Sequence, residues 1–245
     1  MKIANRMENL SPSVTMAITA LARELKAQGK DILSFSAGEP DFDTPEIIKQ
    51  AAIKAINDGQ TKYTAVEGII ATKQAIINKL KKDHNLDYKL DNILISNGAK
   101  HSLFNLFQVL VEEGDEVIIP APYWVTYPEQ VKFSDGVPVF IDTDDSTEFK
   151  ITPEQLKAVI TPKTKVLLLN TPSNPTGSVY TKEELTALGK VLEGTDIIVL
   201  SDEMYEKIIY NGKKFTAAAE VSEDMFKRTV TINGLSKAVA MTGWR

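Results

Sequence analysis

Lys237 is the residue whose surroundings most suggest chemistry, because it follows a short apolar strand. Residues 229–232 form a β-branched run typical of a buried strand, and Gly234 allows a turn before the lysine. A lysine at the end of a buried strand can lose solvation, which lowers the pKa of its amine and makes it reactive toward an aldehyde. Arg245, eight residues further on, offers a planar group suited to a phosphate. Together they would suit a phosphorylated aldehyde such as pyridoxal 5′-phosphate, although a lone lysine is usually just solvated.

Other polar and aromatic residues follow the ends of further predicted strands, and ligands of open α/β sheets bind outside those carboxyl ends. Asp202 directly follows the apolar run 197–201, and a buried carboxylate needs a cationic or donor partner. Asn174 stands between two prolines on a rigid loop, and Gly98 opens a helix whose N–H groups favour an anion. With Trp124, these residues would place a carboxylate, an amide, anion donors and an aromatic ring at one edge of the sheet.

Each of these residues also has an ordinary structural explanation. Trp124 can be core, Asn174 can belong to a plain turn, and Asp202 can cap the turn that follows it. Gly98 can serve only the strand-to-helix turn. The motifs of competing cofactor and hydrolase sites are missing from the sequence, namely the Gly-x-Gly-x-x-Gly turn, the P-loop and the Gly-x-Ser-x-Gly elbow.

The composition excludes several classes of site. The 245 residues are 43% hydrophobic and 25% charged, as in an ordinary globular protein, with no window near the ~18 apolar residues of a membrane helix. The start shows no secretory signal. Without cysteine and with two histidines, we expect no thiolate nucleophile, no histidine triad and no metal site. A net charge of −5 with interspersed signs argues against nucleic acid. We expect a cytoplasmic protein without membrane or nucleic-acid partners.

Alternating strand and helix patterns predict an α/β fold with a mostly parallel sheet covered on both faces. Residues 1 to about 45 look less regular. Capping boxes at Thr152–Gln155 and Thr181–Glu184 predict two helix starts. Strands are expected at 93–96, 116–119, 137–141, 165–170, 197–201 and 229–232, and helices at 13–28, 44–58, about 65–82, 101–112, from 153, and 181–192.

Short motifs along the whole chain carry a family resemblance. They are Ala37-Gly38-Glu39-Pro40-Asp41-Phe42, Thr61-Lys62-Tyr63, Asn97-Gly98-Ala99-Lys100, Pro122-Tyr123-Trp124, Pro172-Ser173-Asn174-Pro175-Thr176-Gly177, Ser201-Asp202-Glu203-Met204-Tyr205, and Ser236-Lys237 through Arg245. In their order and spacing the chain resembles the fold-type I pyridoxal-phosphate aminotransferases, most closely the bacterial aspartate aminotransferases.

The resemblance implies the three-layer αβα sandwich of the pyridoxal-phosphate-dependent transferases, in a homodimer. Residues 1–45 would belong to a small domain and 46–245 to the large cofactor-binding domain. The family continues beyond the motif that ends at Arg245, into a part that completes the small domain and supplies an arginine for the substrate α-carboxylate. We therefore expect a chain truncated before that part.

The resemblance also implies a role for each site residue. Lys237 would bind the cofactor as a Schiff base and act as acid and base, Asp202 would pair with the pyridinium nitrogen, and Tyr205 would tune the cofactor with Asn174. The expected cofactor contacts are Gly98, Ala99, Trp124, Asn174, Asp202, Tyr205, Lys237 and Arg245, with Tyr63 from a second subunit. The expected substrate contacts are Gly38, Trp124 and Asn174, with Lys100, Ser13 and Thr15 reading an acidic side chain.

The expected reaction is a ping-pong transamination in which L-aspartate, or a similar amino acid, gives its amino group to 2-oxoglutarate. Other fold-type I chemistries share Lys237, Asp202 and Asn174, so an alanine, aromatic or prephenate aminotransferase or a β-lyase stays open. A truncated, non-catalytic form of such an enzyme also stays open.

Overall fold

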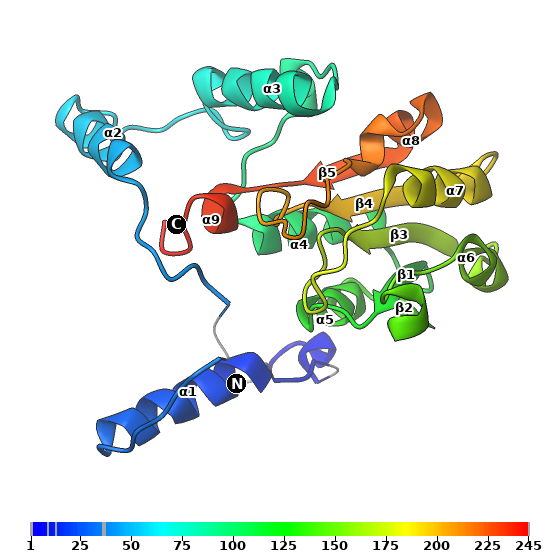
Figure 1. Cartoon of the computed structure of the whole chain (residues 1–245), viewed down its shortest axis with the longest axis horizontal. Helices are drawn as coiled ribbons and strands as arrows, with labels where there is room; N and C mark the ends of the chain where they lie inside the picture. The colour runs from blue at the N-terminus through cyan, green and yellow to red at the C-terminus, as the bar shows by residue number, and fades with distance from the viewer. Residues whose placement is uncertain (1, 9, 13, 36–37, 245) are drawn as a thin grey trace.

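A parallel five-stranded sheet is the centre of the fold, as the computed structural model shows for residues 2–8, 10–12, 14–35 and 38–244 (Figure 1). Neighbouring strands are all parallel, in the order β2-β1-β3-β4-β5. The strands are β1 (Glu116–Ala121), β2 (Val137–Asp142), β3 (Thr164–Asn170), β4 (Ile198–Asp202) and β5 (Thr229–Ile232). The chain leaves β1 for β2 on one side and returns to β3 on the other, which opens a ligand crevice at the carboxyl ends in folds of this kind.

Helices cover both faces of the sheet. Successive strand residues point to opposite faces, so each strand contributes side chains to both layers. Ile118 and Leu167 belong to one hydrophobic cluster, with side chains of α6, α7 and α8, whereas Val117 and Leu168 belong to another, with α4 and α5. The expected αβα sandwich is therefore confirmed. The helices of these layers are α4 (Ala99–Leu110), α5 (Thr126–Phe133), α6 (Pro153–Val159), α7 (Lys182–Leu192) and α8 (Glu223–Arg228).

Both predicted capping boxes begin helices as expected. Thr152 accepts from the amide of Gln155 at the start of α6, and Thr181 accepts from that of Glu184 at the start of α7. The sequence patterns did not predict α5 and α8, which are short. The remaining elements of the body, defined as residues 70–244, are α3 (Ile70–His84), α9 (Leu235–Ala238) and the 3-10 helices η2 (Leu90–Asn92), η3 (Asp145–Thr147) and η4 (Ala218–Glu220).

The expected strand at 93–96 is wrong. This segment joins η2 to α4 without pairing to a described strand, and the amide of Ile95 donates to the carbonyl of Glu67 at 3.0 Å instead. The backbone at Gly68 lies close to the Ile95 side chain. A Cβ on Gly68, whose φ is +107°, would lie 2.5 Å from Cδ1 of Ile95. The run is apolar enough for a strand, but a strand also needs a paired neighbour.

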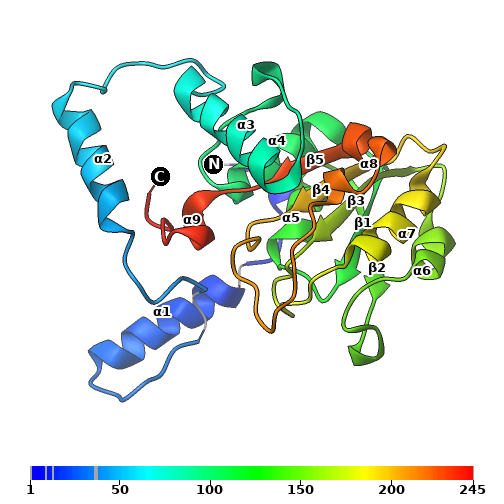
Figure 2. The ribbon, with the colours of Figure 1, turned by 45° about the horizontal axis from the view of Figure 1, so that its top comes forward.

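The N-terminal arm, defined as the described residues before 70, lies apart from the sheet (Figures 1 and 2). It contains η1 (Asn5–Met7), α1 (Val14–Ala27) and α2 (Glu46–Asn57), so both expected helices form. No residue of α2 is buried, and Phe35 is 95% exposed. Within the described ranges, we find no helix with the length and apolarity needed to span a bilayer.

Candidate cofactor site

Asp202 is a buried carboxylate at the carboxyl end of β4, with 4% of its surface exposed. Its Oδ2 accepts a hydrogen bond from the hydroxyl of Tyr127 at 2.7 Å, and its Oδ1 accepts from the amide of Met204 at 3.3 Å. Burial raises the pKa of Asp202 to about 6, although the Tyr127 hydrogen bond acts in the opposite direction. Both donors are neutral, so the ionised carboxylate would gain from a cationic partner at this position.

Tyr127 is a site residue that sequence reasoning missed. It lies on α5, is 1% exposed and meets the ring of Trp124 edge-on at a centroid distance of 5.3 Å. Burial and the nearby Asp202 charge raise its pKa well above 10, so its hydroxyl keeps its proton and remains a donor. The available signal was a tyrosine three residues after Trp124, since a buried tyrosine hydroxyl needs a polar partner.

Asn174 and Tyr205, both expected to contact the cofactor, lie next to each other. The Asn174 side-chain amide donates to the Tyr205 hydroxyl at 3.4 Å. The Asn174 backbone amide donates to Oδ1 of Asn170 at 2.7 Å, and the Asn170 side chain donates to the carbonyl of Asp202 at 2.9 Å. Asn170 therefore joins the ends of β3 and β4. Burial raises the pKa of Tyr205, and the Asp202 charge raises it further.

The turn before α4 contains the two predicted anion donors, of which the Gly98 amide donates instead to the carbonyl of Ser96 at 2.9 Å. Gly98 precedes the helix with φ of 83°, a left-handed conformation that favours glycine, and Ala99 is the first helical residue. The first amides of a helix cannot be bonded within it and point toward an incoming anion. Beyond them, the ammonium of Lys100 lies 5.0 Å from the centre of the Trp124 ring.

Lys237 follows β5 on α9, half-buried at the same edge of the sheet. Ile232 pairs with Asp202, which places the start of the lysine segment beside the end of β4. The Lys237 amine donates to the backbone carbonyl of Gly38, a predicted substrate contact. Thr242 donates to Glu39 at 3.0 Å, so the loop that begins at Gly38 lies along the lysine segment.

Thr44 forms a further contact between this loop and the lysine segment. Its hydroxyl donates to the carbonyl of Ala240 at 2.5 Å and accepts from the indole N–H of Trp244 at 3.0 Å. Ala240 has φ of 52°, which is unfavourable for a residue with a side chain. We refer to Thr44, Ala240 and Trp244 as the threonine bridge. It was not expected from the sequence.

The other predicted site residues stay predictions. Ser13 and Arg245 lie outside the described residues. Thr15 is exposed at the start of α1, and Tyr63 is fully exposed in the loop between α2 and α3.

The described residues fit pyridoxal 5′-phosphate. Asp202 would provide the anion for a protonated ring nitrogen, and Tyr205 and Asn174, which lie together, would serve an oxygen. The half-buried Trp124 would provide an aromatic surface, and the α4 amides would provide phosphate donors. A lysine follows the neighbouring strand. The strongest feature is the buried Asp202 carboxylate. Its donors, the Tyr127 hydroxyl and the Met204 amide, are neutral, so a protonated ring nitrogen beside it would be stabilised.

The parallel sheet between two helical layers has the aspartate aminotransferase-like fold. The chain belongs to the family Aminotransferase class I and II, whose sequence profile matches residues 30–245. It is 55% identical, over all of its length, to the aspartate aminotransferase of Geobacillus stearothermophilus, and 53% identical to the aspartate/prephenate aminotransferase of Nitrosomonas europaea. It spans 62% of the length of each of these relatives.

Two solved structures are similar throughout the chain. The aspartate aminotransferase from Rhizobium meliloti superposes with a TM-score of 0.96 at 45% identity, over 100% of this chain and 62% of that one. The aspartate aminotransferase from Thermus thermophilus with maleate gives a TM-score of 0.96 at 42% identity, over 100% of this chain and 63% of that one.

Proposed function

We propose that this protein is a pyridoxal 5′-phosphate-dependent transaminase of the cytoplasm that moves the amino group of L-aspartate, or a similar amino acid, to 2-oxoglutarate. The observation that carries the proposal is the buried Asp202 carboxylate beside Tyr205, Asn174 and the lysine-bearing segment. The names of the relatives support the same class of reaction. Residues 1–45 would form part of a small domain and residues 46–245 the cofactor-binding domain.

Besides Lys237, eight residues would hold the cofactor. Asp202 binds the protonated ring nitrogen, Tyr205 and Asn174 donate to the phenolic oxygen, and Trp124 stacks on the ring. The amides of Gly98 and Ala99, with Arg245, bind the phosphate, and Tyr63 of a second subunit in a homodimer adds its hydroxyl. When bound, the cofactor supplies an electron sink for the negative charge that forms at the substrate Cα.

Lys237 is the residue that binds and moves protons. Its Nζ would hold the cofactor and, when free, would take the proton from the substrate Cα. The same nitrogen would later give up that proton. Asp202 keeps the ring nitrogen protonated throughout, because a buried carboxylate stabilises a neighbouring cation.

A further set of residues would recognise the substrate. The backbone of Gly38 would contact a substrate carboxylate, and Lys100, with Ser13 and Thr15, would bind the side-chain carboxylate. The position of Lys100 over the Trp124 ring supports this, because it holds an ammonium beside the proposed cofactor surface. The maleate in the Thermus thermophilus structure is a dicarboxylate, which fits the same assignment.

Trapping of the cofactor tests this proposal. The full-length protein should be yellow with pyridoxal 5′-phosphate, and borohydride should bleach it and leave the cofactor mass on the Lys237 peptide. Lys237→Ala should retain no label, whereas Lys182→Ala, on an exposed helix start, should label normally. With aspartate and then 2-oxoglutarate, the spectrum should change and return. A protein that takes up no cofactor would instead support a non-catalytic role.

Prephenate transamination is a second candidate, because relatives at 53% and 50% identity are named aspartate/prephenate aminotransferases. Lys100→Ala should raise the KM for aspartate roughly tenfold to a hundredfold, since a charged hydrogen bond is lost, and change the KM for alanine little. Steady-state kinetics on aspartate, alanine and prephenate would measure this, with Lys157→Ala on α6 as the control. Equal losses on aspartate and alanine would remove the acidic-substrate assignment.

A further inference from the structure

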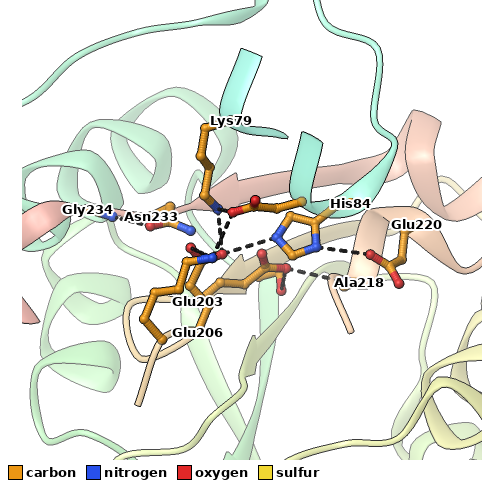
Figure 3. Close-up of polar contacts among 11 residues, drawn as sticks. Lys79, His84, Glu203, Glu206, Ala218, Glu220, Asn233 and Gly234 are labelled. Atoms are coloured by element: carbon orange, nitrogen blue, oxygen red, sulfur yellow. Dashed lines mark hydrogen bonds and ion pairs between the residues drawn. The ribbon is translucent and has the colours of Figure 1, made fainter. Parts of the chain in front are cut away.

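A second polar cluster includes Glu203 and Glu206, which belong to the turn that carries Asp202 and Tyr205 (Figure 3). The chain turns sharply over residues 203–208, with the Glu206 amide donating to the Glu203 carbonyl at 3.1 Å and the Ile208 amide to the Tyr205 carbonyl at 2.8 Å. Asp202 and Tyr205 serve the cofactor site, whereas the side chains of Glu203 and Glu206 take part in the cluster. The cluster joins this turn to α3 and η4.

His84, the last residue of α3, links two carboxylates. Its Nε2 lies 3.2 Å from Oε2 of Glu206, and its Nδ1 lies 3.1 Å from Oε2 of Glu220 on η4 (Figure 3). The side chain is 7% exposed. A neutral imidazole has one N–H and an ionised carboxylate only accepts, so both contacts are hydrogen bonds only when the ring is the doubly protonated imidazolium. With both carboxylates ionised, the geometry therefore favours the imidazolium.

When His84 is an imidazolium, the positive and negative charges around it are equal in number. Oε2 of Glu206 also accepts from Lys79 at 2.6 Å, and Lys207 bonds Asp83 at 2.7 Å. Glu203 is fully buried; its Oε1 accepts from Ser201 and from the amide of Ala218, and its Oε2 has no partner among the described residues. Burial raises the pKa of Glu203 to about 7, which favours its neutral form. The cations Lys79, Lys207 and His84 then match the anions Asp83, Glu206 and Glu220 one for one.

A metal ion is a weaker interpretation of the same cluster. Ligand atoms of Asp83, His84 and Glu206 lie within 4.8 Å of one another. However, the ammonium groups of Lys79 and Lys207 already contact the two carboxylates. A divalent cation would have to displace them and take its place beside like charges.

We propose that His84 is a positioning residue whose imidazolium fastens α3 and η4 to the Asp202–Tyr205 turn and thereby holds both side chains in place for the cofactor. The link to the cofactor rests on the proposed function, whereas the link between His84 and the turn does not. The described groups that face His84 are Glu203, Glu206 and Lys207 on the turn, Glu220 on η4, and Lys79 and Asp83 on its own helix.

The pH range of this effect follows from the charges. Burial and the nearby charge of Lys79 lower the pKa of His84, whereas the hydrogen bond to Glu206 and the charge of Glu206 raise it, with a net rise above 6.5. A raised folded-state pKa means that the stabilisation is complete below pH 6.5 and is lost as the pH rises through the folded-state value. The pKa of Glu206 is lowered to about 2, because its contacts with His84 and Lys79 outweigh burial, so Glu206 stays ionised across this range.

His84→Gln and His101→Gln form a matched pair, because the chain has two histidines and His101 is exposed on α4. Histidine NMR of the full-length protein should show one titration that is absent from His84→Gln, and it should lie above pH 6.5. The dissociation constant for pyridoxal 5′-phosphate, measured by absorbance, should rise about tenfold in His84→Gln at pH 6. The ratio to the unmutated protein should approach one at pH 9, and His101→Gln should bind normally at both pH values.

Glu220→Gln provides a milder second variant, which should lower the NMR pKa of His84 by removing one carboxylate. A His84 pKa below 6.5, a binding ratio that does not change with pH, or a stoichiometric shift of the His84 signals by Zn²⁺ would each overturn the proposal. If the unmutated protein binds no cofactor, the proposed function fails, and the two NMR measurements still decide whether His84 fastens the turn.

Discussion

Helices of the body and of the N-terminal arm have similar apolar spacing, but only those of the body bury their apolar side chains. In the body, Leu156 of α6 and Leu185 of α7 are completely buried against the sheet. In the arm, Leu21 of α1 is 53% exposed and Ile56 of α2 is 65% exposed, although both follow the same helical spacing. The comparison shows that periodicity determines which residues share a helix face, whereas the presence of a facing surface determines whether that face is buried.

The largest expected difference between the two regions is in core stability. Leu167→Ala removes a fully buried side chain from β3 and should lower the free energy of unfolding by about 2–5 kcal/mol, through lost burial and the cavity left behind. Ile56→Ala in α2 should change it by less than about 0.5 kcal/mol. Urea unfolding of both variants measures this. A loss above about 1 kcal/mol for Ile56→Ala would show that the arm is covered in solution.

A smaller effect is expected where the arm and the body meet. Thr44→Val keeps the shape of the side chain but removes both hydrogen bonds of the threonine bridge, which should cost about 1–2 kcal/mol. The indole N–H signal of Trp244 should shift in NMR, and the signal of Trp124 should not. Thr44→Ser keeps the hydroxyl and is the control. Unchanged stability and an unchanged Trp244 signal would mean that the arm and the body are independent at this point.

The parts predicted from sequence are those that depend on local pattern. β3, β4 and β5 were found from apolar or β-branched runs, and the two capping boxes from hydroxyl and carboxamide or carboxylate residues three positions apart. The grouping of Asp202, Tyr205 and Asn174 followed from strand ends and family motifs, and their contacts agree with it.

The missed parts depend on contacts between distant residues. Tyr127 acts on Asp202 from 75 residues away, and His84 meets Glu206 and Glu220 from 122 and 136 residues away. No local period encodes such pairs. The failed strand at 93–96 has the same cause, because a run of apolar residues cannot specify which neighbour it will pair with.

The threonine bridge has a consequence for the timing of assembly. Its two contacts join residues 196 and 200 positions apart, so they form only after nearly the whole described chain has been synthesised. At roughly 5–20 residues per second, Thr44 waits on the order of 10–40 s on the ribosome before its partners exist. During that interval Gly38, Glu39 and Thr44 are present without the lysine segment that they contact, and the two segments can pair only after both have been made.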